Sequence, residues 1–465
     1  MLKLFENDSP RKMLFRFSLY GFLKNQRYFE PFLILFFRQV GMSFFIIGLL
    51  IGYREVLINI FEVPTGAAAD LYGRRKCMIL SFTAYIASFM IFALAGALWQ
   101  FFVAMGLYAL GDALRSGTHK AMIFDYLARH DRSQEKTMYY GKTRSWSKFG
   151  SALSIVIAAA IVFTTAGLQG QADTRPYRYL FLACLLPYLL GLINFAGYPS
   201  YLDGPAGQKV SLREIFYHLA GVAKDAVKSS RLRQLFVESI GFEGTYKVAK
   251  DYLQPIVKYA ALSLPLLGMM GKLQKTAVLI LVVYVMLHLL EGMASRRSEY
   301  LRVRAGGEES GARVLWWVNL VVFTVIAMGL GLGLYVGTGV ASWGVVVAII
   351  GFVALAVVQN LWRPIQVGRY NTAVGAAVGA TVLSIESQLK SITAAILAPA
   401  IGLAVDALRT SSNVATLDAS FVPVAMVGMI ISVAVLISTR PMSEPIDHRR
   451  VETSDKTGQI IEEDL

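Results

Sequence analysis

The most constraining feature of the sequence is a series of roughly twelve apolar stretches of about 20 residues, the length that crosses a hydrocarbon core about 30 Å thick. They begin near Leu14, Phe44, Cys77, Leu98, Thr143, Tyr179, Leu235, Leu266, Val314, Gly344, Ala380 and Ser420. Apolar and aromatic residues make up 55% of the 465 residues and charged residues only 16%, whereas a soluble domain has about 25% charged residues. This composition excludes an ordinary soluble enzyme and predicts an all-α integral membrane protein.

The basic residues lie mainly in the intervals between the apolar stretches. The formal net charge is +14, but nucleic-acid binding needs a basic face on a soluble domain, so no nucleic-acid partner is expected. With an even number of spans, the basic intervals fall on the side of both termini, which is the positive-inside pattern of a multi-pass membrane protein. Because the N-terminal segment lacks the order of a signal peptide, we expect both termini to be cytoplasmic.

A long polar interval divides the apolar stretches into two sets of six. We predict a six-helix half at residues 1–202, a cytoplasmic linker at residues 203–233, a second six-helix half at residues 234–440 and a cytoplasmic tail at residues 441–465. The linker contains a capping box, Ser211 to Glu214, and apolar residues at helical spacing. It predicts an amphipathic helix, either on the inner membrane surface or as a solvated connection.

The two sets of stretches are weakly similar to each other. Displacing the chain by about 220 residues places Arg27 on Lys247, and a larger displacement aligns Asp112–Arg115 with Asn360–Arg363. Each match is weak by itself. Several matches in the same order favour two parallel halves related by an internal repeat.

The loop between the second and third apolar stretches carries a distinctive pattern. Its sequence, EVPTGAAADLYGRRKCM, contains Gly66, Asp70, Gly73, Arg74 and Arg75. Gly66 permits close approach of helices, and Gly73 permits a tight turn. The carboxylate of Asp70 can accept hydrogen bonds or face a helix N-terminus. The basic residues anchor the loop on the cytoplasmic side.

This loop resembles the signature G-x-x-x-D-x-x-G-R/K-R/K of the major facilitator superfamily, and the segment from Gly111 to Leu127 is similar to the fourth helix of its bacterial drug-exporter-like members. The resemblance implies twelve transmembrane helices in two pseudo-symmetric six-helix halves, in a bacterial inner membrane. It also implies a secondary active transporter, not an enzyme, that works by alternating access as a monomer without a cofactor. In the family the loop arginine pairs with an acid of the fourth helix, so Arg74 and Asp125 are expected to form a latch in the outward-facing state.

Charged residues inside the predicted spans are candidates for function, because each costs about 2.5 to 3.5 kcal/mol on insertion scales. The resemblance places the first, fourth, seventh and tenth spans around a central cavity. The predicted substrate-binding residues are Arg27, Arg115, Lys247, Asn360 and Arg363. Arginine donates paired hydrogen bonds to carboxylate or phosphate, so this set favours an anionic group. The alternative is internal pairing of Arg27 with Glu30, Lys247 with Glu243, and Arg115 with Asp112.

Acidic side chains beside these cations are candidates for proton coupling, since burial and an approaching cation change the protonation of a carboxylate. These candidates are Asp112, Glu243 and Glu30. Glu55 on the second span and the pair of Glu386 and Lys390 on the eleventh are assigned to gating. The five histidines show no metal-ligand spacing, so no metal site is expected.

Together these features predict proton-coupled export of a small organic solute, with an anionic or zwitterionic substrate favoured. Besides that solute, the expected partners are the lipid bilayer and protons. An importer or exchanger of organic anions is the closest alternative within transport. A non-transporting membrane sensor or scaffold on the same fold is the alternative outside it.

Overall fold

The computed structural model describes residues 9–166, 173–203, 221, 228–263, 270–331, 338–411 and 419–439, and within them every regular element is helical. The first half contains α1 (Pro10–Leu23), α2 (Leu33–Gln39), α3 (Phe44–Tyr72), α4 (Arg74–Leu94), α5 (Leu98–Arg115), α6 (Thr118–Arg129), α7 (Lys136–Ala166) and α8 (Arg175–Ala196). The second half contains α10 (Ser230–Ser239), α11 (Thr245–Ala249), α12 (Leu253–Ser263), α13 (Lys272–Arg304), α14 (Glu308–Gly331), α15 (Thr338–Ser411) and α16 (Val422–Ser438). The predicted linker helix and the C-terminal tail lie almost entirely outside the described residues.

The helices follow the predicted series of membrane spans. In the described ranges, nine helical segments are long and apolar enough to cross a membrane, among them two within α15, Trp343–Val374 and Thr381–Thr410. The other three predicted spans are the first, fourth and seventh. Asp112 and Arg115 lower the hydropathy of α5, and the first and seventh spans are divided into shorter helices.

The backbone of the first and seventh spans is interrupted. The first span leaves α1 at Leu23 and enters α2 through a 3-10 turn, Glu30–Phe32. The seventh span contains a π-helical segment, Ile240–Gly244, and a 3-10 turn, Lys250–Tyr252. Irregular backbone at membrane depth is tolerated where it is buried in protein or lines a cavity. Both interruptions therefore indicate the polar centre of the molecule.

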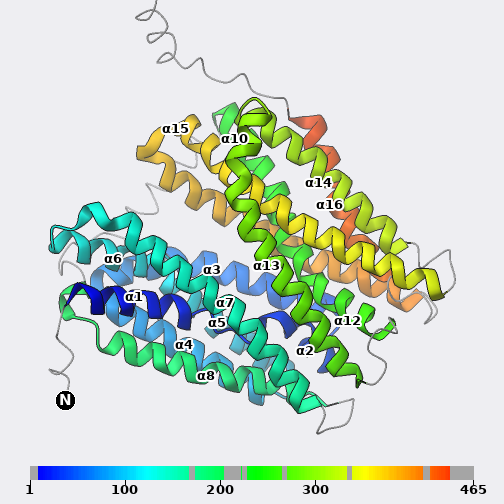
Figure 1. Cartoon of the computed structure of the whole chain (residues 1–465), viewed down its shortest axis with the longest axis horizontal. Helices are drawn as coiled ribbons and strands as arrows, with labels where there is room; N and C mark the ends of the chain where they lie inside the picture. The colour runs from blue at the N-terminus through cyan, green and yellow to red at the C-terminus, as the bar shows by residue number, and fades with distance from the viewer. Residues whose placement is uncertain are drawn as a thin grey trace, which may run out of the picture.

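The chain forms two bundles that face each other (Figure 1). α1 to α8 form one bundle and α10 to α16 the other, and α13 contacts α7 across the boundary. α15 is a hairpin, because the side chains of Arg363 and Glu386 are in contact although the two residues are 23 positions apart. A straight helix would separate them by about 35 Å.

The two bundles pack tightly at one end, where α3 meets the second arm of α15. A side chain at Gly48 would overlap the carbonyl of Ala398, and a Cβ at Gly52 would lie 2.7 Å from the carbonyl oxygen of Ala395. We call this the Phe44 end, after the first residue of α3, and the opposite end, which holds Gly73, the motif end.

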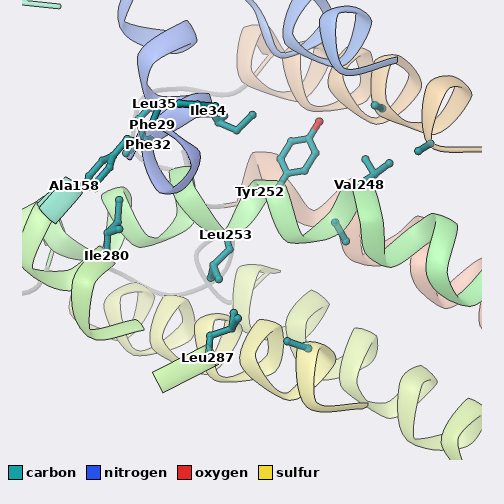
Figure 2. Packing of buried hydrophobic residues seen from close by; sticks show 14 of the residues in the cluster. Phe29, Phe32, Ile34, Leu35, Ala158, Val248, Tyr252, Leu253, Ile280 and Leu287 are labelled. Atoms are coloured by element: carbon teal, nitrogen blue, oxygen red, sulfur yellow. The ribbon is translucent and has the colours of Figure 1, made fainter. Parts of the chain in front are cut away.

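Apolar residues of both bundles also form one continuous buried cluster (Figure 2). In that figure the first bundle contributes Phe29, Phe32, Ile34, Leu35 and Ala158, and the second contributes Val248, Tyr252, Leu253, Ile280 and Leu287. Since these residues exclude water between the bundles, they stabilise the present arrangement of the two halves.

Candidate functional site

Two cavities lie between the bundles. The first, of about 340 Å³, has Leu33 and Gln254 in its wall. The second, of about 630 Å³, extends toward the motif end past Glu62 and Lys120. Four charged side chains line both cavities and therefore lie at their junction: Arg27, Arg54, Glu55 and Lys247.

The interruption of the first span is bridged by a side chain of the other bundle. Breaking the helix leaves backbone groups without an intrahelical partner. The amide of Gln254, on α12, donates to the carbonyl oxygen of Glu30 at 2.9 Å and accepts from the N–H of Ile34 at 2.8 Å. All three residues are in the wall of the first cavity, so these contacts join the two bundles there.

In the first bundle, one carboxylate is surrounded by cations. Oδ1 of Asp112 accepts hydrogen bonds from Tyr85 Oη at 2.5 Å, Arg115 Nη2 at 3.0 Å and Arg27 Nη2 at 3.3 Å. All three donors converge on this oxygen, and Oδ2 accepts no hydrogen bond from the described part of the chain. One negative charge is therefore shared by two guanidinium groups.

Arg27 is positioned by the interrupted segment that carries it. Asn25 donates to the carbonyl of Gly21 at 2.7 Å, and Gln26 donates to the carbonyl of Gly150 at 3.1 Å. The expected pairing of Arg27 with Glu30 is wrong, because the non-helical backbone removes the i, i+3 spacing on which it depended. Glu30 lines the first cavity instead.

One ion pair joins the two bundles at the junction. Nζ of Lys247 lies 2.5 Å from Oε2 of Glu55 and donates to Oγ of Ser391 at 3.1 Å. Arg54 Nη2 lies 3.4 Å from the other oxygen of Glu55. The expected pairing of Lys247 with Glu243 is therefore wrong, since Lys247 reaches across to the first bundle. A contact between bundles fits the gating role predicted for Glu55.

The second bundle has its own cluster of four charges. Glu243 pairs with Arg363 at 3.0 Å and with Lys390 at 2.5 Å. Glu386, which is fully buried, contacts the same two cations. Two acids thus neutralise two bases here, and Arg363 and Lys390 together link α15 to the π-helical segment that carries Glu243.

The predicted substrate-binding residues divide into two groups. Arg27, Arg115 and Lys247 line the cavities. Among the described residues that line these two cavities, neither Arg363 nor Asn360 is found, and Asn360 donates to the carbonyl of Ala356 in its own helix at 2.9 Å. The excess of positive charge at the junction therefore comes from the first bundle and Lys247.

The motif loop agrees with the expectation at Gly73 and at Asp70, which accepts a hydrogen bond from Arg74, and differs from it at Gly66. Gly73 has φ of 107°, which confirms the tight turn. Asp203 accepts from the backbone N–H of Arg75 at 3.0 Å, so it occupies the N-terminus of α4, a place considered for Asp70. Among the residues that the structure describes, a Cβ at Gly66 would meet nothing within 4 Å, so the predicted close helix approach there is wrong.

The predicted latch is open in this structure. Arg74 lies 3.4 Å from Asp70, and Asp125 lies 3.2 Å from Arg129. No ion pair between Arg74 and Asp125 occurs in the described part of the chain. The cavity that extends toward the motif end is compatible with an unlatched state.

A buried charge network in the second bundle was missed by the sequence analysis. Arg369, whose side chain is 2% exposed, pairs with Glu238 of α10 and lies 2.6 Å from Glu309 of α14. Glu238 and Arg369 are 131 residues apart, so no local pattern relates them. Arg54 was also missed, although its position beside Glu55 could have suggested it.

Two helical bundles around a charged cavity between them are the architecture of a membrane transporter. The model of the Major Facilitator Superfamily matches residues 25–439, and the chain belongs to this family. The family and the proteins compared below are transporters and not enzymes. The predicted all-α, multi-pass fold is thus confirmed.

Curated relatives match only part of the chain. It is 32% identical over 110 residues to the uncharacterized MFS-type transporter YxaM of Bacillus subtilis (strain 168), covering 24% of this chain and 27% of that protein. It is 26% identical over 101 residues to the multidrug resistance protein MdtH of Yersinia pestis (strain Pestoides F), covering 22% and 25%. The chain therefore matches about a quarter of the length of these relatives.

Solved structures match nearly the whole chain. The nucleoside transporter NupG superposes with a TM-score of 0.70 at 10% identity, covering 92% of this chain and 99% of that one. A POT family transporter in complex with a thioalcohol-conjugated peptide gives 0.62 at 14% identity, covering 92% and 96%. At these identities the likeness concerns the fold.

Proposed function

We propose that the chain is a secondary active transporter of a small anionic or zwitterionic organic solute, which binds at the junction of the two cavities. The charge of the second cavity carries this proposal. Its wall has three acids, Glu55, Glu62 and Asp112, against seven bases, Lys24, Arg27, Arg54, Arg115, Lys120, Arg144 and Lys247. An anionic group stabilises such a surface, because uncompensated charges of one sign are costly inside a membrane protein.

The charges of the first cavity suit the remaining part of the same solute if that part is zwitterionic or neutral. It is lined by four bases and four acids: Arg27, Arg54, Lys247, Lys250, Glu30, Glu55, Asp251 and Glu291. An anionic group at the junction would leave the rest of the solute in this balanced polar environment. Selectivity for net anions would then come from the second cavity.

We infer that the motif end faces the cytoplasm of a bacterial inner membrane, with both termini on that side. The cavity open at the motif end then corresponds to the inward-facing state, in which an exporter loads its solute. The multidrug resistance protein named above supports export. We infer a functional monomer, because the two halves and the cavity between them are parts of one polypeptide.

Proton coupling is proposed at Asp112, with Glu243 as the counterpart in the second bundle. A proton on Asp112 would release Arg27 and Arg115, and an anion bound to these arginines would in turn favour that proton. The sharing of Asp112 by Arg27 and Arg115 is therefore the observation that favours the second candidate, in which proton and anion move together and a proton gradient drives import.

Flux measurements in liposomes test these proposals. The purified protein is reconstituted, a pH gradient is imposed, and uptake and efflux of labelled organic anions, zwitterions and cations are compared. We expect anion or zwitterion flux that responds to the gradient and is lost in Arg27→Ala, with Arg302→Ala on the exposed face of α13 as control. Movement of the solute against the proton flow indicates export by antiport, and movement with it indicates symport. Absence of flux for every solute would favour the sensor or scaffold.

A further inference from the structure

Two arginines of the junction are held against one aromatic ring. The guanidinium carbons of Arg27 and Arg54 each lie 5.5 Å from the ring centroid of Tyr108. Tyr108 is buried at 4% exposure and sits on α5. Because Arg27 comes from the interrupted first span and Arg54 from α3, the ring brings together cations from two separate elements.

Both arginines retain a buried donor. Nε of Arg27 and Nε of Arg54 are buried, and neither donates to an acceptor in the part of the chain that the structure describes. A buried guanidinium N–H without an acceptor is costly. Both side chains line both cavities and are 17% and 28% exposed, so an occupant of the junction can contact the exposed part of each guanidinium group.

The acids at the junction and beside it in the second cavity do not balance the cations there. Asp112 is shared by Arg27 and Arg115 through one oxygen, and Glu55 is shared by Arg54 and Lys247. Two carboxylates therefore serve four cations. A ligand with a single negative charge would leave one positive charge uncompensated, whereas a ligand group with two charges would neutralise the set.

We propose that the junction binds a doubly charged oxyanion group, of the phosphate or phosphonate type, between Arg27 and Arg54. This inference rests on the proposed function, because it names the class of anion taken by the same cavity. Three oxygens on one centre can accept hydrogen bonds from two guanidinium groups at once, which a single carboxylate cannot do as completely.

Three probes with the same phenyl ring separate charge from shape. Thermal stabilisation of the purified protein is measured with phenylphosphonate, benzenesulfonate and benzoate at mildly alkaline pH. There the phosphonate carries two charges on a tetrahedral group, the sulfonate one charge on a tetrahedral group, and the carboxylate one charge on a planar group. We expect phenylphosphonate to bind with a Kd about tenfold lower than either of the others.

Variants locate the effect. Arg54→Gln is expected to weaken phenylphosphonate binding about tenfold while leaving benzoate binding nearly unchanged. Arg54→Lys keeps the charge but loses the planar fork, so it should weaken phenylphosphonate binding by a smaller factor. Arg302→Gln, which alters an exposed pair with Glu299 on α13, is the matched control. The thermal midpoint without ligand shows whether each variant is folded. If Arg54→Gln is not folded, the binding of Arg54→Lys tests the inference instead.

The outcomes are distinguishable. Equal binding of benzoate and phenylphosphonate, or of benzenesulfonate and phenylphosphonate, would overturn the inference of a doubly charged ligand and leave the anion transporter intact. A preference for phenylphosphonate that survives in both Arg54 variants would also overturn it, because the site would lie elsewhere. Stabilisation by none of the three anions would overturn this inference, whereas the proposed function fails only if the flux panel shows transport of neither anions nor zwitterions.

Discussion

Asp406 caps the helix that begins at Phe44. Its carboxylate, on the second arm of α15, accepts from the backbone N–H of Phe44 at 3.1 Å and from that of Phe45 at 2.8 Å. The first N–H groups of a helix lack intrahelical acceptors and lie at the positive end of the helix dipole. A side chain of one bundle therefore stabilises a helix of the other, and it can do so only while the Phe44 end is closed.

Replacing Asp406 by Ala should open the Phe44 end more often. Loss of a helix cap costs about 1 kcal/mol, which corresponds to about a fivefold shift between closed and open states. The measurement is labelling of Ile51→Cys, in the wall of the first cavity, by an impermeant maleimide after Cys77 and Cys184 are changed to Ser. The labelling rate should rise about fivefold.

Thr410→Val is the matched control for this experiment. The Thr410 hydroxyl donates to the carbonyl of Asp406 at 3.0 Å within the same helix, so its loss alters the local surface without touching the contact between bundles. Equal labelling in the Asp406→Ala variant and the parent would show that the cap does not hold this end closed.

Gly48 and Gly66 form an internal comparison on one helix. A Cβ at Gly48 would overlap the backbone of Ala398, whereas one at Gly66 would meet nothing within 4 Å. Gly48→Ala should lower the free energy of unfolding by about 1 to 3 kcal/mol through overpacking. Gly66→Ala should be neutral or stabilise by up to about 1 kcal/mol, because alanine is the better helix former. Thermal denaturation in detergent measures both, and a similar loss in each would contradict the packing explanation.

The ion pair between Glu55 and Lys247 should show energetic coupling. Glu55→Gln removes the carboxylate that Lys247 and Arg54 share. We expect a loss of about 1 to 3 kcal/mol, less than for a fully buried pair because the lysine is about one-third exposed. Adding Lys247→Met should recover part of that loss, which gives a coupling energy of at least about 0.5 kcal/mol in a double-mutant cycle.

The exposed pair of Arg302 and Glu299 is the reference for that cycle. Their side chains are 37% and 68% exposed, so the coupling should stay below about 0.5 kcal/mol. Additive effects of Glu55→Gln and Lys247→Met would mean that the contact between the bundles contributes nothing to stability.

Three features could be predicted because each depends on local rules: the membrane spans, the tight turn at Gly73 and the pairing of Arg115 with Asp112. Bilayer thickness fixes the length of an apolar run, a positive φ favours glycine, and residues three apart on a helix are neighbours. These rules need no knowledge of how the two bundles pack.

The contacts of the cavity depend on that packing. Arg27 and Asp112 are 85 residues apart, and Glu55 and Lys247 are 192 apart. Sequence spacing therefore suggested that Arg27 forms an ion pair with Glu30, on the assumption of a continuous helix. The interruption of the first span removes that neighbour and turns the arginine toward another helix. Charged residues within a span indicated where the site lies, but not which residues pair there.

The network of Arg369, Glu238 and Glu309 should be required for folding of the second bundle. Arg369→Met leaves the buried Glu238 without its cation and Glu309 with only Arg231, at 3.9 Å. Loss of one partner from a buried pair costs about 3 to 5 kcal/mol, so the thermal midpoint in detergent should fall strongly. The triple variant with Glu238→Gln and Glu309→Gln should recover most of the loss, since it leaves no buried charge behind. Arg302→Met, on the exposed face of α13, should leave the midpoint nearly unchanged. A midpoint for Arg369→Met equal to that of the parent, or a triple variant no more stable than the single one, would show that the network does not stabilise this bundle.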